Sequence, residues 1–248
     1  MVKSQLTTRI AAAGLWTAFM ALTLLAALFL VWQLLARADY GYPLWYEVIG
    51  IDQTIARYGP RNRYREDFET TTKAERVRLF AELAAAVRHH GEGLEALTYH
   101  DPSGKAIAPL LTAPEIQHLR DVARLFAGLW MVGWVALAGW LALVGALRWR
   151  GYRLPALKQL LLGTVLGSVL VALVVTALGP VRVFYRLHTW IFPPDHPWFF
   201  YYEDSLMTMM MQAPVIFGWI ALAWAALAVG FAAGLLVVAR RVCRGSGH

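Results

Sequence analysis

The stretch VRVFYRLHTWIFPPDHPWFFYYEDSLMTMMMQAPVIF, residues 181–217, joins the third and fourth long apolar segments of the chain. It combines His188 and His196 with arginines, carboxylates and many aromatic side chains. Turns that face water favour Gly, Asn and Ser, whereas Trp and Tyr are enriched where a membrane meets water. We therefore expect this segment to lie along a bilayer surface and to shape a site there.

The chain outside this segment is dominated by apolar residues. Its 248 residues are 58% hydrophobic, which is too apolar for an ordinary soluble domain. A helix rises about 1.5 Å per residue, so about 20 apolar residues cross a bilayer. The predicted transmembrane helices lie within residues 10–36, 112–148, 156–181 and 214–239. The sequence thus predicts an all-α membrane protein with four transmembrane helices.

Charge distribution predicts how these helices are oriented. Nine Lys and Arg residues and no acid lie at the two chain ends and in the connection 148–158, whereas acids balance cations in the two larger connections. Cytoplasmic loops carry such an excess of Lys and Arg. We expect both termini in the cytoplasm and the larger connections outside. The net charge of +7 therefore reflects membrane orientation and does not indicate nucleic-acid binding.

Residues 37–111 are predicted to form a small mixed α/β cap outside the membrane. Thr72 and Glu75 have capping-box spacing before an apolar helical pattern that runs to about His90. Residues 101–104, Asp-Pro-Ser-Gly, predict the turn of a short hairpin. Thr112 and Glu115 form a second capping box, from which one continuous helix leads into the second span. Residues 182–213 are expected to form an interfacial loop.

Two further features have structural interpretations. Gly163 and Gly167 have the GxxxG spacing that allows close helix packing. The single cysteine, Cys243, lies among cytoplasmic arginines and cannot form an internal disulfide.

The seven histidines all lie outside the apolar spans, which argues against a b-type haem bundle. His118, at the start of the second span, and His188, after the third, are expected at similar depth on the outer face. Two imidazoles there can act as an acid–base pair in acyl transfer, be structural, or bind a metal. Asp121 is placed to orient His118, although a salt bridge to Arg124 competes.

His196 is the candidate third ligand for a zinc site with His118 and His188, although the spacing of the three matches no common zinc motif. The residues alone therefore leave a zinc-dependent membrane lipid hydrolase open. They also leave open a non-enzymatic membrane assembly factor that binds a partner through the cap.

Three groups of residues resemble the bacterial lipoprotein intramolecular transacylase family of four-span membrane proteins. They are residues 111–126, LTAPEIQHLRDVARLF, residues 187–192, LHTWIF, and the later positions Trp198, Asp204–Leu206 and Pro214–Phe217. The chain departs from the family pattern at Ile191, where a Phe-Phe pair is frequent, and in the insert 193–197.

The resemblance implies transfer of the sn-2 acyl chain of a diacylglyceryl group to the α-amino group of the same lipoprotein's N-terminal cysteine, giving a lyso-form lipoprotein. It implies His118 and His188 as the catalytic pair, with His188 favoured as the base. Supporting roles are assigned to Asp121, Arg182, Tyr185 and Arg186. The expected substrate-lining residues are Trp190, Phe192, Trp198, Phe199 and Met210.

The resemblance also implies the setting in which the protein works. The expected partners are diacylglyceryl-modified bacterial lipoproteins and membrane lipid, with no cofactor, no metal and no nucleic acid. We expect a monomer in the bacterial cytoplasmic membrane, with the site on the extracytoplasmic face.

Overall fold

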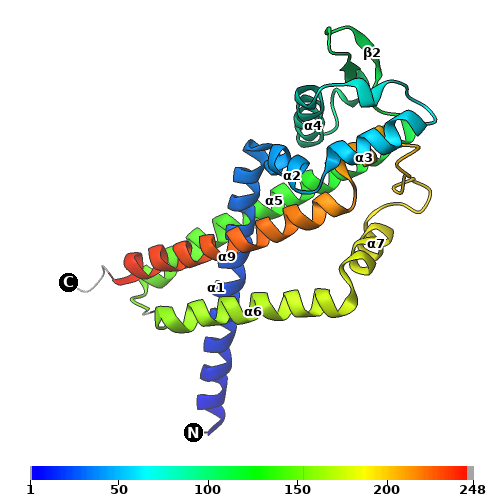
Figure 1. Ribbon diagram of the computed structural model, residues 1–248. Helices are drawn as coiled ribbons and strands as arrows, with labels where there is room; N and C mark the ends of the chain where they lie inside the picture. The colour runs from blue at the N-terminus through cyan, green and yellow to red at the C-terminus, as the bar shows by residue number, and fades with distance from the viewer. Residues whose placement is uncertain (1, 153, 245–248) are drawn as a thin grey trace. The chain divides into compact units, whose positions relative to one another are not determined.

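The computed structural model describes the backbone of residues 2–152 and 154–244, and side chains from residue 13 onward within these ranges. The chain is mostly helical (Figure 1). Its helices are α1 (Val2–Arg37), α2 (Tyr42–Val48), α3 (Ile51–Tyr58), α4 (Lys73–Arg88), α5 (Ala113–Trp149), α6 (Leu157–Leu178), α7 (Pro180–Ile191), α8 (Leu206–Met211) and α9 (Val215–Arg244). Two strands, β1 (Thr98–His100) and β2 (Ala106–Pro109), form an antiparallel hairpin. Short 3-10 turns connect several of these elements.

Among the described residues, four helices are long and apolar enough to cross a membrane, as predicted. They are α1 from Ala13 to Arg37, α5, α6 and α9. The continuous helix predicted from Thr112 into the second span is also confirmed, because α5 runs without a break for 37 residues.

The region predicted as third span and interfacial loop has different element boundaries. The helix α6 ends at Leu178, and Gly179 adopts a positive φ of 83°. Pro180 then begins α7, in a first-turn position where its missing N–H costs nothing. Residues 182–213 therefore do not form one loop, because they contain most of α7 and all of α8.

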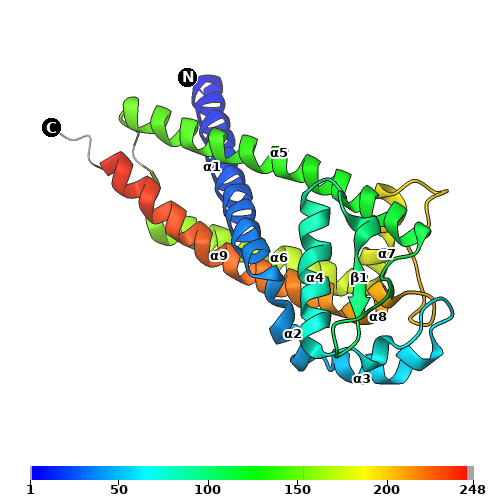
Figure 2. The same ribbon diagram turned by 90° about the horizontal axis from the view of Figure 1, so that it is seen from above.

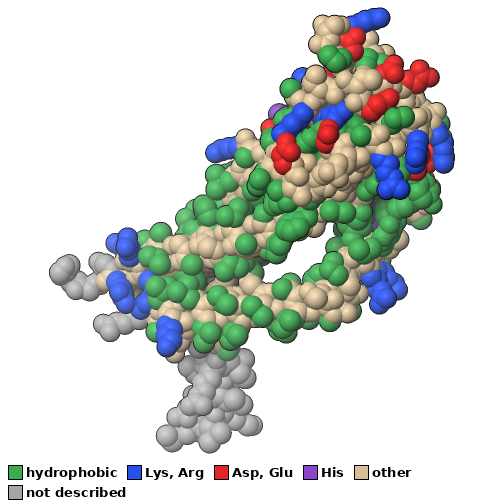
Figure 3. All heavy atoms as spheres, in the orientation of Figure 1, with side chains coloured by type: hydrophobic (Ala, Val, Ile, Leu, Met, Phe, Trp, Pro, Cys, Tyr) green, Lys and Arg blue, Asp and Glu red, His purple; other side chains and the backbone are tan. Residues whose placement is uncertain are grey.

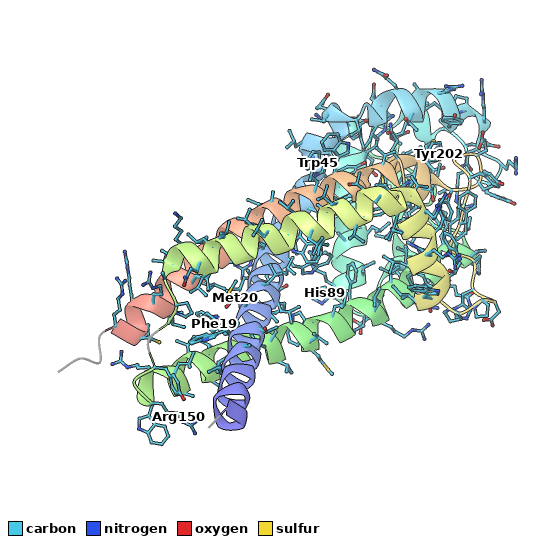
Figure 4. The ribbon with its side chains drawn as sticks, turned by 90° about the horizontal axis from the view of Figure 1, so that it is seen from below. Phe19, Met20, Trp45, His89, Arg150 and Tyr202 are labelled. Atoms are coloured by element: carbon cyan, nitrogen blue, oxygen red, sulfur yellow. The ribbon has the colours of Figure 1, made fainter. Side chains whose placement is uncertain are left out.

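The described residues divide into two compact units. The first, here called the membrane unit, comprises residues 2–34, 130–177 and 223–244. Its buried apolar cluster draws on α1, α5, α6 and α9: Phe19, Ala26, Trp140, Val144, Leu147, Leu160, Leu236 and Ala239. Phe19, labelled in Figure 4, is fully buried. The Trp140 indole donates to the Thr23 hydroxyl at 3.0 Å, so these two buried polar groups of α5 and α1 satisfy each other.

In the membrane unit, helices α1 and α5 approach each other closely at Gly133, which is not one of the two glycines predicted for close packing. A Cβ added to Gly133 would lie 2.1 Å from the Phe29 ring, so α1 packs directly on the α5 backbone there. By contrast, a Cβ on Gly163 would meet only the tip of Met20, and one on Gly167 would meet nothing within 4 Å. The expected close packing at Gly163 and Gly167 is therefore wrong within the described residues.

The second unit, here called the cap unit, comprises residues 35–129 and 178–222. Its helix α4 begins where predicted, since the Thr72 side chain accepts from the Glu75 amide. The Glu75 carboxylate does not complete the capping box. It accepts instead from Arg78 and from the backbone and ring N–H groups of His100, and so joins α4 to the hairpin.

Residues 40–65, which belong to the predicted cap, fold mainly into α2 and α3. The Tyr42 ring stacks on Phe80 of α4 at 4.0 Å, and its buried hydroxyl donates to the carbonyl of Met210 at 2.9 Å. Gln212 donates to the Thr54 hydroxyl, which fixes the end of α8 against α3. Figure 2 shows α4 beside β1 and α3 beside α8.

Charged side chains are distributed differently on the two units. In the membrane unit, the face in Figure 3 is apolar along its helices, with Lys and Arg gathered at their ends. Arg150, labelled in Figure 4, is exposed just after α5. In the cap unit, acidic and basic side chains cover the part formed by α3, α4 and the hairpin.

Candidate active site

His118 is held by a fixed helix start. The amide and hydroxyl of Thr112 donate to Glu115 Oε2, each at 2.6 Å, and the Ser205 hydroxyl donates to Glu115 Oε1. Ser205 in turn caps α8 by accepting from the Thr208 amide. Glu115 and Ser205 are both buried. His118 lies one turn after this buried carboxylate and so projects from a rigid part of α5.

His188 is oriented by its own helix. Its Nδ1 lies 2.9 Å from the carbonyl oxygen of Phe184, one turn earlier in α7. A carbonyl can only accept, so Nδ1 carries the proton and Nε2 of the neutral ring is free to take another. Burial lowers the pKa of His188, and the carbonyl contact offsets this only in part. The ring is therefore a neutral base at ordinary pH.

The two imidazoles lie together, as the sequence led us to expect. Their ring centroids are 6.3 Å apart with an interplanar angle of 32°. This spacing leaves room for about one small group or water between the ring edges, so both can reach one reacting centre. Nδ1 of His118 is buried and has no hydrogen-bond partner among the described residues. Buried polar atoms are seldom left unpaired, so this atom is suited to bond substrate or water.

Aromatic rings enclose the pair. The Phe192 ring lies 5.0 Å from His118 and 5.3 Å from His188. Trp198 lies 4.9 Å from His188, and Phe200 lies 6.3 Å from His118. Apolar walls exclude water and strengthen electrostatic interactions inside a site.

Asp121 does not orient His118. Its Oδ1 accepts from Arg124, as the competing interpretation held, and its Oδ2 lies 2.6 Å from Nδ1 of His196. Spacing along a helix identifies partners within that helix, and His196 is 75 residues away in sequence.

The zinc site considered from the sequence is not assembled. The described residues contain no group of three or more His, Cys, Asp or Glu side chains placed to hold a metal ion. Nδ1 of His196 is engaged by Asp121 and the Nδ1 proton of His188 by Phe184.

The other predicted residues have varied surroundings. Arg182 and Arg186 are exposed, and within the described residues neither makes an ion pair. The Tyr185 ring packs on Trp198 at 5.4 Å and on Phe199 at 6.0 Å. Trp190 is 74% exposed.

Met210 lies in a different environment from these residues. It is fully buried in the cap unit, where it forms part of the packing around α8.

Sequence reasoning missed several contributors to the site. The Phe184 carbonyl could have been predicted as a hydrogen-bond partner of His188, because it lies four residues earlier in the same helix. The partnership of Ser205 with Glu115 and the ring of Phe200 depend on tertiary contacts. Tyr202, labelled in Figure 4, also anchors the segment after Phe200, because its hydroxyl donates to the Ala213 carbonyl at 3.3 Å.

Comparison with known proteins identifies the family of the chain. The family model described as "Lipoprotein intramolecular transacylase Lit" matches residues 77–213, more than half of the chain and a range that includes both site histidines. The chain belongs to the lipoprotein intramolecular transacylase family. Among curated proteins no match is found.

Two solved structures share the fold of this family member. Both are of the membrane integral lipoprotein intramolecular transacylase Lit from Bacillus cereus, with one histidine replaced by arginine in the first and by alanine in the second. The arginine variant has a TM-score of 0.62 at 16% identity, covering 99% of this chain and 98% of that one. The alanine variant has a TM-score of 0.65 at 14% identity, covering 98% of each chain. At sequence identities this low, the similarity between the structures establishes the fold alone.

Proposed function

We propose that this protein moves the sn-2 acyl chain of a diacylglyceryl-modified lipoprotein onto the α-amino group of that lipoprotein's N-terminal cysteine. The product is a lyso-form lipoprotein. The observation that carries the proposal is the pair His118 and His188, 6.3 Å apart inside an aromatic enclosure and within the region that matches the family.

The proposed chemistry uses both rings. The α-amino nitrogen attacks the ester carbonyl carbon while Nε2 of His188 takes a proton from the nitrogen. The carbon–oxygen bond to the sn-2 position then breaks, and that proton reaches the glyceryl oxygen through His118. One amide forms, one ester is lost and no external donor is consumed. Because nucleophile and ester belong to one molecule, positioning can supply effective molarities of about 10⁵ M or more.

The remaining predicted residues have secondary roles in this proposal. Trp190 and Phe199 are exposed beside the enclosure and are suited to contact acyl chains. Arg182 and Arg186 are exposed cations that make no ion pair with a described residue, which suits them to binding lipid headgroup phosphates or the tetrahedral oxyanion. The buried environment of Met210 favours a packing role over contact with substrate.

The proposed location is the bacterial cytoplasmic membrane, with the site on the extracytoplasmic face and both termini in the cytoplasm. The four apolar helices and the one-sided distribution of Lys and Arg support this orientation. We propose that a monomer is sufficient, since both histidines and their aromatic surroundings come from one chain.

The transfer leaves the mass of the lipopeptide unchanged, so the assay must locate the acyl chain. Mild alkali cleaves esters and spares amides. A diacylglyceryl peptide therefore loses two acyl chains, whereas the lyso-form loses one and keeps an N-acyl group. We expect purified wild-type protein to convert a synthetic diacylglyceryl lipopeptide into a product that retains one chain.

His118→Ala and His188→Ala are the matched variants for this assay. Both variants should leave the diacylglyceryl peptide unconverted, so that mild alkali still releases two acyl chains from it. Loss of both chains after treatment with folded wild-type protein would reject the proposed activity. Fragmentation spectra of the product should place the retained chain on the cysteine nitrogen.

A further inference from the structure

The segment 193–200 connects α7 to the rest of the cap unit and carries part of the enclosure around the histidines. We propose that the bond between Asp121 and His196 is a tether that closes this segment over the site, and that Asp121 and His196 are positioning residues. The role in catalysis rests on the proposed function.

Few hydrogen bonds hold the segment 193–200 in place. Within the described residues, the bond from His196 to Asp121 is the only one that joins residues 193–200 to another element. The other hydrogen bond of this segment is internal, from the His196 amide to the Pro193 carbonyl. Beyond residue 200 the chain is fixed independently, by Arg63 to Asp204 and by Ser205 to Glu115.

Both side chains of the tether are largely withdrawn from solvent. The Asp121 side chain is 4% exposed and that of His196 is 22% exposed. A buried carboxylate is costly unless both oxygens are paired, and here Arg124 takes one oxygen and His196 the other. Charge-assisted hydrogen bonds of this kind are roughly twice as strong as neutral ones. The contact is therefore strong enough to hold a short segment in place.

Both residues of the tether lie close along the chain to residues of the site. Asp121 lies three residues after His118 in α5, so the two side chains share a helix face. His196 lies between Phe192, which contacts both imidazoles, and Trp198, which contacts His188.

The wall residues after His196, Trp198 and Phe200, depend on this bond, whereas the Phe192 amide also bonds to the His188 carbonyl. The three prolines of the segment, Pro193, Pro194 and Pro197, restrict its backbone, so fixing His196 restricts its neighbours as well. Loss of the bond should therefore admit water to both histidines.

The two ring nitrogens of His196 provide a matched pair of variants. The Nδ2 of asparagine is as many bonds from Cβ as Nδ1 of histidine, whereas Nε2 of glutamine corresponds to Nε2 of histidine. His196→Asn therefore keeps a donor where the tether needs one, and His196→Gln places it elsewhere. Asp121→Ala removes the acceptor and leaves Arg124, whose side chain is 72% exposed, free to meet water.

Turnover of the synthetic diacylglyceryl lipopeptide is the first measurement. We expect kcat to fall about 10- to 100-fold in His196→Gln and Asp121→Ala, as loss of one charge-assisted hydrogen bond allows, with a smaller change in KM. His196→Asn should retain most of the wild-type kcat. A double variant, Asp121→Ala with His196→Gln, should be no worse than either single variant, because both remove the same contact.

Chemical reactivity is the second measurement and does not require turnover. Diethyl pyrocarbonate modifies accessible neutral imidazoles, and peptide mapping by mass spectrometry reports each histidine separately. We expect modification of His118 to rise severalfold in His196→Gln and Asp121→Ala and to stay near wild type in His196→Asn. His100, whose ring bonds to Glu75 in the hairpin, is the internal control and should not change.

Two results would overturn the tether. One is wild-type kcat and wild-type His118 reactivity in His196→Gln. The other is a His196→Asn variant as slow as His196→Gln with His118 still protected, since the Nδ1 donor would then not be what His196 contributes. A wild-type protein that does not convert the lipopeptide would reject the proposed function alone, because the reactivity of His118 tests the tether separately.

Discussion

Nδ1 of His188 lies 2.9 Å from the carbonyl oxygen of Phe184, so the helix that carries this histidine also sets its tautomer. In many acid–base sites a carboxylate performs this task. Here a backbone carbonyl suffices, and Asp121 is engaged elsewhere. The basic nitrogen of His188 is therefore fixed without a second ionised side chain.

The first prediction concerns His188. His188→Asn retains a donor for the Phe184 carbonyl but has no basic nitrogen. Product formation should fall about 10²- to 10⁴-fold, the usual contribution of a general base. The lipopeptide assay with alkali release measures it, and circular dichroism should show an unchanged helical fold. Activity within about threefold of wild type would show that His188 is not the base.

The second prediction concerns pH. Burial lowers the pKa of His188, so the folded protein binds this proton less readily than the unfolded chain does. The ring should stay neutral at pH values where an exposed histidine, with a pKa near 6.5, is already charged. The free energy of unfolding should accordingly increase as the pH rises from the pKa of His188 in the folded protein to its pKa in the unfolded chain.

Nitrogen chemical shifts of labelled His188 measure this titration directly. They should show Nδ1 protonated and Nε2 unprotonated at neutral pH. A midpoint at or above that of an exposed histidine would contradict the prediction.

The third prediction concerns Glu75 in the cap unit. Hydrogen bonds from Arg78, assisted by His100, lower the pKa of Glu75 to about 2. The ionised Glu75 carboxylate therefore stabilises the fold fully above the usual glutamate pKa, and this contribution is lost as the pH falls through about 2. Glu75→Gln should lower the melting temperature at pH 6 and have a much smaller effect near pH 2. An equal effect at both pH values would exclude this ionic contribution.

The fourth prediction separates the two roles open to Arg182 and Arg186. If these arginines bind headgroups, the double change to Gln should reduce activity in vesicles containing phosphatidylglycerol. It should then have little effect in pure phosphatidylcholine, because each Lys or Arg near an anionic surface contributes about 1 kcal/mol. This is the result we expect. An equal loss in both vesicle types would instead assign them to the oxyanion.

Much of the fold follows from local sequence signals. The four apolar helices could be predicted because length and hydropathy alone decide whether a helix can cross a bilayer. The start of α4 at Thr72 and the hairpin turn at residues 101–104 were also predictable, because capping and turn residues act over a few positions. Gly179 and Pro180 carried a local signal for a helix boundary that the aromatic content of residues 181–217 obscured.

The contacts of the site were less predictable, because they depend on tertiary structure. Spacing within α5 offered Arg124 as a partner for Asp121, but no local pattern indicates His196. The family resemblance implied that Met210 lines the substrate site, whereas Tyr42 and α3 cover the helix in which it lies. The meeting of His118 and His188 was inferred from the order of spans, which fixes their common depth but not their separation.

The buried carboxylate of Glu115 also bears on how the protein is made. Its partner Ser205 lies 90 residues later in the chain, beyond the third apolar helix. A ribosome must therefore synthesise most of the polypeptide before the start of α5 can acquire its final hydrogen bonds. Nascent chains that stop short of Ser205 should lack this hydrogen bond, so the part of α5 that carries His118 is completed late in synthesis, close to the emergence of the last helix.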